Sequence, residues 1–94
     1  MYRIVLACDG VPPSAGAEAA VDITNEFVEH RPWWNNARCT WDGTRLVLQA
    51  DSENDSSGPA LTDEFSDALS ACVAELFDGE ITLESIVEVP PAAP

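Results

Sequence analysis

Apolar and polar residues follow a strand-like pattern in four short segments of the chain. Residues 2–8 (YRIVLAC) form an apolar, β-branched run that ends at Asp9-Gly10, which predicts a strand in the middle of a sheet. Residues 36–41 and 45–50 alternate with period two, and so do residues 81–89. Because this alternation is typical of strands with one buried face, we expect four strands.

The two middle strands are separated by Asp42-Gly43, a dipeptide that favours a two-residue type I′ turn. Such a turn pairs Trp41 with Thr44, Cys39 with Leu46 and Ala37 with Leu48. These pairs place the apolar residues of both strands on one face, with Arg38 and Thr40 on the other. The sequence therefore predicts a β-hairpin whose apolar face points to the core.

A helix is predicted from Ala15 to about His30, with Ser14 as its N-cap. Pro32 disfavours helical geometry at Arg31, so the helix should end there. The predicted buried face consists of Ala17, Val21, Thr24 and Val28, flanked by Ala20 and Phe27. The predicted solvent face carries Glu18, Asp22, Glu26 and Glu29.

A second amphipathic helix is predicted from Pro59 to Asp78-Gly79, after a polar loop at 51–58 (DSENDSSG). Its apolar positions are Leu61, Phe65, Leu69, Cys72, Val73 and Leu76. Its acidic residues, which we expect to face solvent, are Glu64, Asp67, Glu75 and Asp78.

The elements follow one another as strand, helix, strand, strand, helix, strand, which resembles the split β-α-β pattern of ferredoxin-like folds. Because crossover connections are right-handed, we predict a four-stranded antiparallel sheet of order 4-1-3-2 with both helices on one face. This α+β fold should form a single domain over residues 1–89, followed by a flexible Pro/Ala tail at 90–94. The fold hosts many unrelated activities, so function has to be argued from individual residues.

The sheet face opposite to the helices is predicted to mix cations with aliphatic residues. Three of the four Arg fall on it, namely Arg3, Arg38 and Arg45. Its other predicted members are Val5, Ala7, Thr40, Val47, Gln49, Thr82, Glu84, Ile86 and Glu88. Two interpretations remain: the Arg residues form weak surface ion pairs with Glu84, Glu88 and other acids, or the face is a dimerisation surface.

The chain has 17 acidic residues against four Arg and no Lys, a formal net charge of −13. This balance argues against direct binding of nucleic acid and against anionic membrane surfaces, since both require cations on the protein. It favours attraction to a basic partner at low salt. Solvated acidic faces without any partner, as in a protein from a salt-rich source, are the alternative. No signal peptide or membrane-length apolar segment is evident, so a cytoplasmic location is expected.

No constellation of catalytic residues is evident, and we predict neither an enzyme nor a bound cofactor. Cys8, Cys39 and Cys72 each lie among apolar residues, which is typical of reduced core thiols. His30 is the only His, and we expect it at a helix C-terminus, where a cation is favourable. The loop after the first strand has too few Gly to bind phosphate.

A calcium loop is a weak third hypothesis. Asp51, Glu53 and Asp55 alternate like the first ligands of an EF-hand. That motif requires Gly next and Glu at its twelfth position, where this chain has Ser56 and Thr62. A solvated loop is the simpler interpretation.

The composition is typical of small acidic inhibitors and immunity proteins, whose acidic faces imitate the phosphates of nucleic acid. We therefore predict a non-catalytic domain that neutralises a basic partner such as a nuclease or toxin. A module that homodimerises through the open sheet face is the alternative. The residues predicted to contact a partner are Trp33, Trp34, Arg38, Arg45, Glu18, Asp22, Glu26, Glu64 and Asp67.

The Trp33-Trp34 pair has two interpretations. It supplies an aromatic anchor of the kind found at interface hot spots, or it closes the end of the core where the chain enters the edge strand. Because adjacent strand residues point to opposite sides, we expect one indole to be buried and the other exposed.

Overall fold

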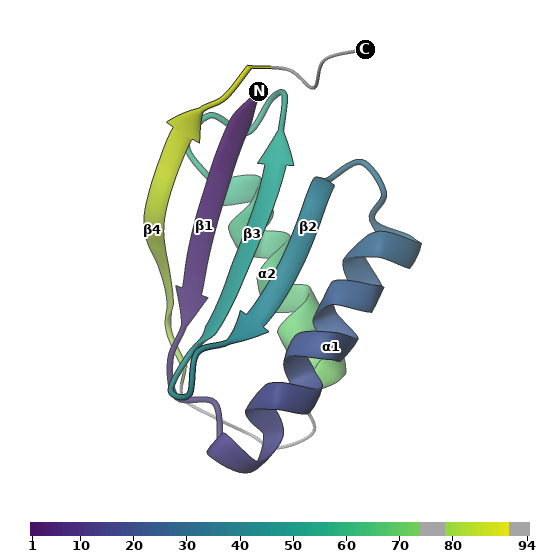
Figure 1. Ribbon diagram of the computed structural model, residues 1–94, viewed down its shortest axis with the longest axis vertical. Coiled ribbons are helices and arrows are strands. Elements are labelled where there is room, and N and C mark those ends of the chain that lie inside the picture. The colour runs from purple at the N-terminus through teal and green to yellow at the C-terminus, as the bar shows by residue number, and fades with distance from the viewer. Residues whose placement is uncertain (74–78, 91–94) are drawn as a thin grey trace.

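A computed structural model describes residues 1–73 and 79–90 of the chain (Figure 1). Its six elements are β1 (Tyr2–Cys8), α1 (Pro13–His30), β2 (Asn35–Trp41), β3 (Leu46–Ser52), α2 (Pro59–Cys72) and β4 (Ile81–Glu88). The strands form one antiparallel sheet in the order β2-β3-β1-β4. The predicted α+β fold of the ferredoxin-like type, with strand order 4-1-3-2, is confirmed.

Both helices pack on the same side of the sheet; in Figure 1, α2 is seen behind the strands and α1 lies beside the edge strand β2. The core lies between these two layers. Ile4 and Leu6 of β1 and Leu48 of β3 are completely buried, and they share one hydrophobic cluster with Phe27 of α1 and Phe65 of α2. Among the described residues, no helix has the length and apolar character needed to cross a membrane.

Helix α1 buries a face that only partly matches the predicted one, since Ala20 and Phe27 are buried as expected. Val21 and Val28, expected inside, are 59% and 61% exposed. The buried residues are Gly16, Ala19, Ala20, Ile23 and Phe27. Small residues add little to a hydrophobic pattern, but they allow a helix to approach a sheet closely, and a Cβ atom at Gly16 would lie within 3.0 Å of the Trp41 ring of β2. Close packing of α1 on the edge strand therefore decides which face is buried.

The ends of α1 follow the sequence signals only in part. The helix begins at Pro13, with Pro12 in the N-cap position and no side-chain cap, so the predicted cap by Ser14 is wrong. Proline at the first helical position is favourable because its φ angle is already helical. The helix ends at His30, as expected from Pro32.

The β2–β3 hairpin has the predicted faces but a different register. Cys39 pairs with Leu48 and Trp41 with Leu46, two residues away from the predicted pairing. A shift of two residues leaves each side chain on its predicted face. Cys39 is therefore buried and Trp41 packs against the core, as expected.

The register differs because the turn is centred on Gly43-Thr44 and not on Asp42-Gly43. The Asp42 carboxylate accepts the backbone N–H of Thr44 (2.8 Å) and that of Arg45 (2.6 Å). The N–H of Asp42 donates to the carbonyl of Arg45 at 3.0 Å. Asp42 is thus the residue before the turn, and Gly43 adopts the positive φ of 102° that the turn requires.

Strand β4 contains an irregularity at Glu84. Beyond this residue, each side chain points to the opposite face from the one that strict alternation predicts. The register with β1 shifts at Glu84, so that Ile86 lies opposite the buried Ile4 and packs against the core. Val87 is consequently on the open face, where it is 50% exposed. The predicted open-face positions of Ile86 and Glu88 are wrong, because strict alternation leaves no place for a β-bulge.

Helix α2 begins at Pro59 as predicted but ends at Cys72, and the predicted helical position of Val73 is wrong, because Val73 adopts extended geometry (φ −103°, ψ 109°). The predicted core residues Leu61, Phe65 and Leu69 are buried. The predicted continuation of the helix through Glu75, Leu76 and Asp78 and most of the predicted tail (91–94) lie outside the described residues.

Candidate functional site

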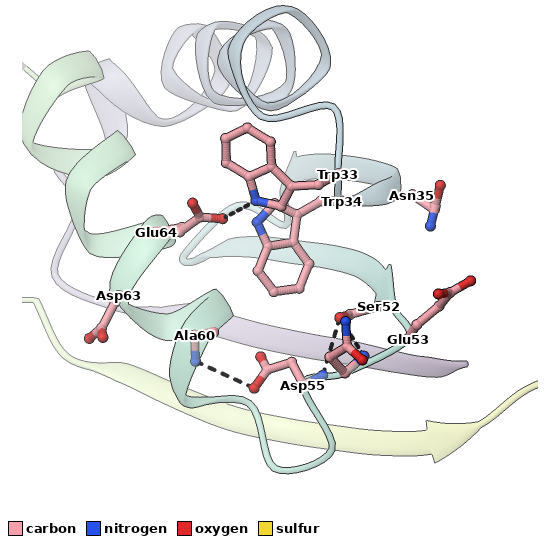
Figure 2. A pocket seen from close by; sticks show the side chains of 10 residues that line it. Trp33, Trp34, Asn35, Ser52, Glu53, Asp55, Ala60, Asp63 and Glu64 are labelled. Carbon is pink, nitrogen blue, oxygen red and sulfur yellow. Dashed lines mark hydrogen bonds between the residues drawn. The ribbon is translucent and has the colours of Figure 1, made fainter.

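Two connections meet at one end of the sheet, the α1–β2 connection (31–34) and the β3–α2 connection (53–58) (Figure 1). A surface hollow of about 710 Å³ opens between them (Figure 2). It is lined by Trp33, Trp34, Asn35, Ser52, Glu53, Asn54, Asp55, Ala60, Asp63 and Glu64. Four of these ten residues are acidic and none is basic, so we call it the acidic hollow.

The two indoles have different environments, as predicted. Trp34 is 7% exposed and belongs to the hydrophobic core cluster, whereas Trp33 is 60% exposed. A turn separates α1 from β2 here, because the N–H of Trp34 donates to the carbonyl of Arg31 at 3.1 Å. The pair therefore combines both interpretations: Trp34 closes the end of the core, and Trp33 is available to a partner.

Arg31 connects the two helices behind the hollow. Its Nη1 donates to Oε1 of Glu64 at 3.1 Å, and its Nη2 lies 3.7 Å from Oε1 of Glu26. Its guanidinium also lies over the ring of Phe27, 5.8 Å from the centroid. The second carboxylate oxygen of Glu64 accepts Nε1–H of Trp33 at 3.2 Å (Figure 2). Glu64 thus fixes the exposed indole to the wall of the hollow.

Asp55 forms the inner part of the hollow beside the start of α2. Its carboxylate accepts the backbone N–H of Leu61 at 3.0 Å and that of Ala60 at 3.4 Å. Its own N–H donates to Oγ of Ser52 at 3.2 Å. These bonds satisfy free donors of the first helical turn, and the helix dipole favours a negative charge there. Asp55 is only 8% exposed, and its carboxylate therefore serves to cap the start of α2.

Glu53 and Asp63 complete the acidic lining. They lie on opposite sides of the hollow in Figure 2, and both are exposed. Within the described part of the chain, neither carboxylate has a cation within 4 Å. Both carboxylates are therefore open to solvent.

The three candidate calcium ligands are not brought together. Asp51 is 2% exposed and accepts two hydrogen bonds from Arg3, at 3.0 and 3.2 Å, and one from Asn36 at 3.0 Å. Burial raises the pKa of Asp51, but these hydrogen bonds outweigh it, and the pKa is lowered. Residues 1–73 and 79–90 contain no cluster of three metal-binding side chains. The geometry gives no support to the calcium hypothesis.

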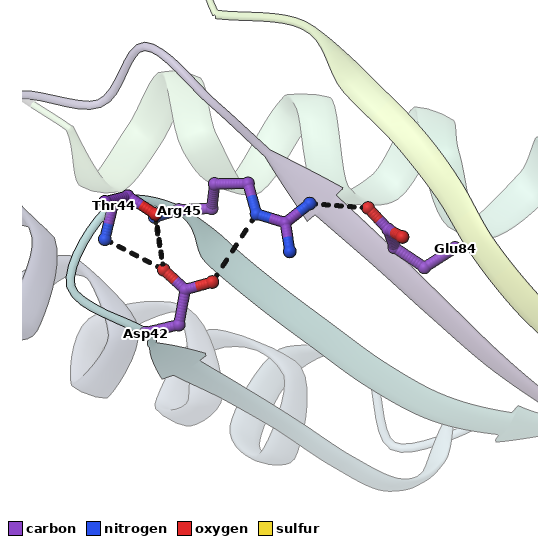
Figure 3. Close-up of polar contacts among 4 residues, drawn as sticks. All are labelled: Asp42, Thr44, Arg45 and Glu84. Carbon is purple, nitrogen blue, oxygen red and sulfur yellow. Dashed lines mark hydrogen bonds and ion pairs between the residues drawn. The ribbon is translucent and has the colours of Figure 1, made fainter.

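The open sheet face has its own polar network around Arg45. The Arg45 guanidinium lies 2.6 Å from Glu84 of β4 and 3.4 Å from Asp42 (Figure 3). Hydrogen bonds from the backbone N–H groups of Thr44 and Arg45 lower the pKa of Asp42 to about 2. Arg38 is exposed and has no acid within 4 Å among the described residues. The ion pairs of Arg45 are solvent-exposed and therefore add little to stability.

The residues predicted to contact a partner are divided between two faces. The helix side carries Trp33, Trp34, Glu64 and Glu26 around Arg31, with Glu18, Asp22 and Asp67 exposed elsewhere on the helices. Arg38 and Arg45 lie on the open face, since their neighbours Cys39 and Leu46 point to the core. One partner surface cannot include all nine residues.

The thiols and the histidine do not form a nucleophilic pair. Burial raises the pKa of Cys8 to about 11 and that of Cys39 to about 12, and it also raises the pKa of Cys72. His30 is exposed at the end of α1, where its Nε2 lies 3.9 Å from Glu29. Buried thiols with raised pKa values are poor nucleophiles because the thiolate is the reactive form.

No match to this chain was found among protein-family models, curated proteins or solved structures. The site therefore rests on its own geometry. Sequence reasoning missed Ser52 and Asp63 as lining residues and the anchoring role of Arg31. The predicted topology contained a signal for them, because α1 and β3 end at the same end of the sheet and bring residues near 33 and 53 together.

Proposed function

We propose that this protein is a non-catalytic, cytoplasmic binding domain that neutralises a basic partner of the nuclease or toxin kind. The supporting observation is that most of its cations are paired within the chain, whereas many of its exposed acids are not. Arg3, Arg31 and Arg45 are each held by acids of the same chain. The helix side, by contrast, exposes acids without a cation within 4 Å in the described residues, namely Glu18, Asp22, Asp63 and Asp67.

A surface of this kind attracts a basic protein from a distance. Most of the 17 acidic residues have no internal compensation, because only four cationic residues oppose them, which leaves the net charge of −13. Complementary potentials raise association rates up to about 10⁸–10⁹ M⁻¹s⁻¹ at low salt. The screening length falls from about 30 Å at 0.01 M salt to about 3 Å at 1 M. Association should therefore be fast and strongly dependent on ionic strength.

Trp33 supplies the short-range apolar contact with the partner. An indole that is 60% exposed beside a hollow has the large apolar area that interface hot spots favour. Its hydrogen bond to Glu64 holds it in place before binding, so little side-chain freedom is lost in a complex. The raised pKa values of the three thiols support the non-catalytic part of the proposal.

The test is the binding of basic nucleases or toxins encoded next to the gene of this protein. Association rates would be measured by stopped-flow fluorescence at ionic strengths from about 0.01 M to about 1 M. A triple variant, Glu18→Gln, Asp22→Asn and Asp67→Asn, should associate roughly tenfold more slowly at low salt. The control is Arg38→Gln on the opposite face, which should not slow association. Absence of binding at low salt would contradict the proposal.

Homodimerisation through the open sheet face is a second candidate. It is supported by Val87, which is 50% exposed there, and by Arg38, which has no acid within 4 Å among the described residues. Sedimentation velocity distinguishes the two candidates. A dimer that Arg38→Glu dissociates would favour this one, and a monomer at all concentrations would exclude it.

A further inference from the structure

We propose that the outer edge of β4 pairs with an extended segment of the basic partner, a segment that carries both basic and apolar residues. The segment would lie beside β4 as an additional strand of the four-stranded sheet. This inference rests on the proposed function, because it takes the occupant from the basic partner and names the conformation in which β4 binds it.

The two edges of the sheet differ in how their backbone is covered. The strand order places β2 and β4 at the edges (Figure 1). Helix α1 covers the edge of β2, since Oγ1 of Thr24 accepts the N–H of Cys39 at 2.9 Å and lies 3.2 Å from its carbonyl oxygen. In the described part of the chain, no strand lies beyond β4, and all eight residues of β4 are exposed or half-buried. The edge of β4 is therefore the one at which a further strand can add.

The pairing of β4 with β1 determines which of its backbone groups point outward. In an antiparallel pair, every second residue bonds to the neighbouring strand. The carbonyl of Glu80 and the N–H of Val89 bond to the two ends of the β1 segment, at 3.2 and 2.8 Å. Counting inward from both ends, with the register shift at Glu84, the N–H and C=O groups of Leu83 and Ile86 point away from β1. These are the groups to which an added strand would bond.

The side chains of β4 differ between its two sides. Leu83 is 48% exposed and lies on the helix side, because it pairs with a buried leucine of β1. Ile86 lies on the same side and packs against the core. A Cβ atom at Gly58, the residue before α2, would lie 3.5 Å from Cδ1 of Leu83, so this side of β4 borders the start of α2. On the open side, Glu84 contacts Arg45 (Figure 3). An added strand would thus place apolar residues on the helix side and basic residues on the open side.

The charge of β4 favours a basic occupant over a second copy of this chain. Residues 80–89 contain Glu80, Glu84 and Glu88 and no basic residue. Glu84 is held by Arg45, but Glu80 and Glu88 have no cation within 4 Å among the described residues. Pairing of two β4 strands would bring carboxylates together along the new seam, and like charges on opposite strands are destabilising. Arginine or lysine residues of a basic segment would meet these carboxylates favourably.

The experiment uses the full chain and a short peptide, so that it does not require the partner to be identified. The probe is an N-acetylated, amidated peptide in which valine and arginine alternate, and it is titrated at low salt while backbone hydrogen exchange is followed by NMR. The outward N–H groups of Leu83 and Ile86 should exchange about tenfold more slowly when the peptide is at about ten times its Kd. The N–H of Val87, which points to β1, should change little.

Two control peptides separate strand pairing from general charge attraction. The first has the same sequence with N-methylated backbone amides, so it keeps the charge but donates no backbone hydrogen bonds. The second has glutamate in place of arginine, so it keeps the backbone donors but reverses the charge. Neither control should slow the exchange of Leu83 and Ile86.

Two pairs of variants separate β4 from the rest of the surface. Leu83→Thr and Val21→Thr each remove an exposed apolar side chain, but only Leu83 lies on β4. Glu88→Gln and Glu18→Gln each remove an exposed carboxylate, the first on β4 and the second on α1. The β4 member of each pair should weaken peptide binding roughly two- to fivefold, and the α1 member should change it less.

Equal protection by the arginine peptide and its N-methylated form, or equal effects within both variant pairs, would overturn the inference. So would protection of Leu83 and Ile86 that rises with protein concentration in the absence of peptide, which would assign the edge to a second copy. If the peptide does not bind but a basic protein still associates in a salt-dependent way, strand pairing is wrong and the proposed function stands. If the peptide protects β4 and no basic protein binds, the strand site stands and neutralisation is wrong.

Discussion

Replacement of Gly16 by alanine tests how α1 is held against the sheet. A Cβ atom at this position would lie closer than 3.0 Å to three atoms of the Trp41 indole, Cδ2, Cε2 and Cε3. These atoms belong to a ring packed between helix and strand, so the ring or the helix has to move. Insertion of an extra methyl into a packed site costs about 1–3 kcal/mol. Alanine also stabilises a helix interior by about 1 kcal/mol relative to glycine. We therefore expect a net loss of up to about 2 kcal/mol.

A double-mutant cycle with Trp41→Ala tests whether contact with the indole causes that loss of stability. In Trp41→Ala the indole is absent, so Gly16→Ala should become stabilising by about 0.5–1 kcal/mol through helix propensity alone. The coupling energy between the two sites should thus be about 1–3 kcal/mol. Urea unfolding of the two single variants, the double variant and the parent protein gives this value. The adjacent exposed site supplies the control, since Ala17→Gly should cost about 1 kcal/mol in both backgrounds. Equal effects of Gly16→Ala in both backgrounds would refute the close contact.

Three further predictions concern stability. Trp34→Ala should lower the free energy of unfolding by about 3–5 kcal/mol because a buried indole is lost, whereas Trp33→Ala should cost about 1 kcal/mol or less, and chemical denaturation of both distinguishes core from surface. Asp55→Ala should cost about 1–2 kcal/mol through loss of the hydrogen bonds to the start of α2, and Asn54→Ala, its exposed neighbour, should remain within about 0.5 kcal/mol of the parent protein. The folded-state pKa of Asp42 is lowered from 3.8 to about 2, so its stabilising contribution is complete above the higher value and is lost as the pH falls toward the lower one. Asp42→Asn should therefore flatten the decrease of stability between those two pH values, and an unchanged acid profile would show that Asp42 contributes nothing.

The sequence was most informative where two signals agreed. The order and type of all six elements followed from apolar periodicity and from Pro and Gly positions, and strand order followed from the handedness of crossovers. One buried and one exposed indole were expected at Trp33-Trp34, but the physical reason differs, because the pair lies in the turn before β2 and not in an alternating strand. Helix α1 carries two apolar stripes that could each face the core, one with Val21 and Val28 and one with Ile23 and Phe27. Only the small residues at Gly16 and Ala19, which let the helix approach β2, decide between them.

The remaining differences arise from bonds that periodicity does not encode. The Asp42 carboxylate moves the hairpin turn by one residue because it accepts two backbone N–H groups. The irregularity at Glu84 exchanges the faces of β4. The acidic hollow combines residues from 33 to 64, so its lining becomes visible only when two connections are placed side by side. The Asp42 bonds are local and belong to turn chemistry, whereas the hollow depends on contacts between segments that lie apart in the sequence.

The central claim, that this protein neutralises a basic partner, is tested most directly by the activity of that partner. The nucleic-acid-cleaving activity of a basic nuclease, sought among the proteins encoded next to its gene, would be titrated with the purified domain at low ionic strength. We predict stoichiometric loss of activity, which Trp33→Ala weakens and which about 1 M salt reverses through screening. Undiminished activity in the presence of excess domain would contradict the account.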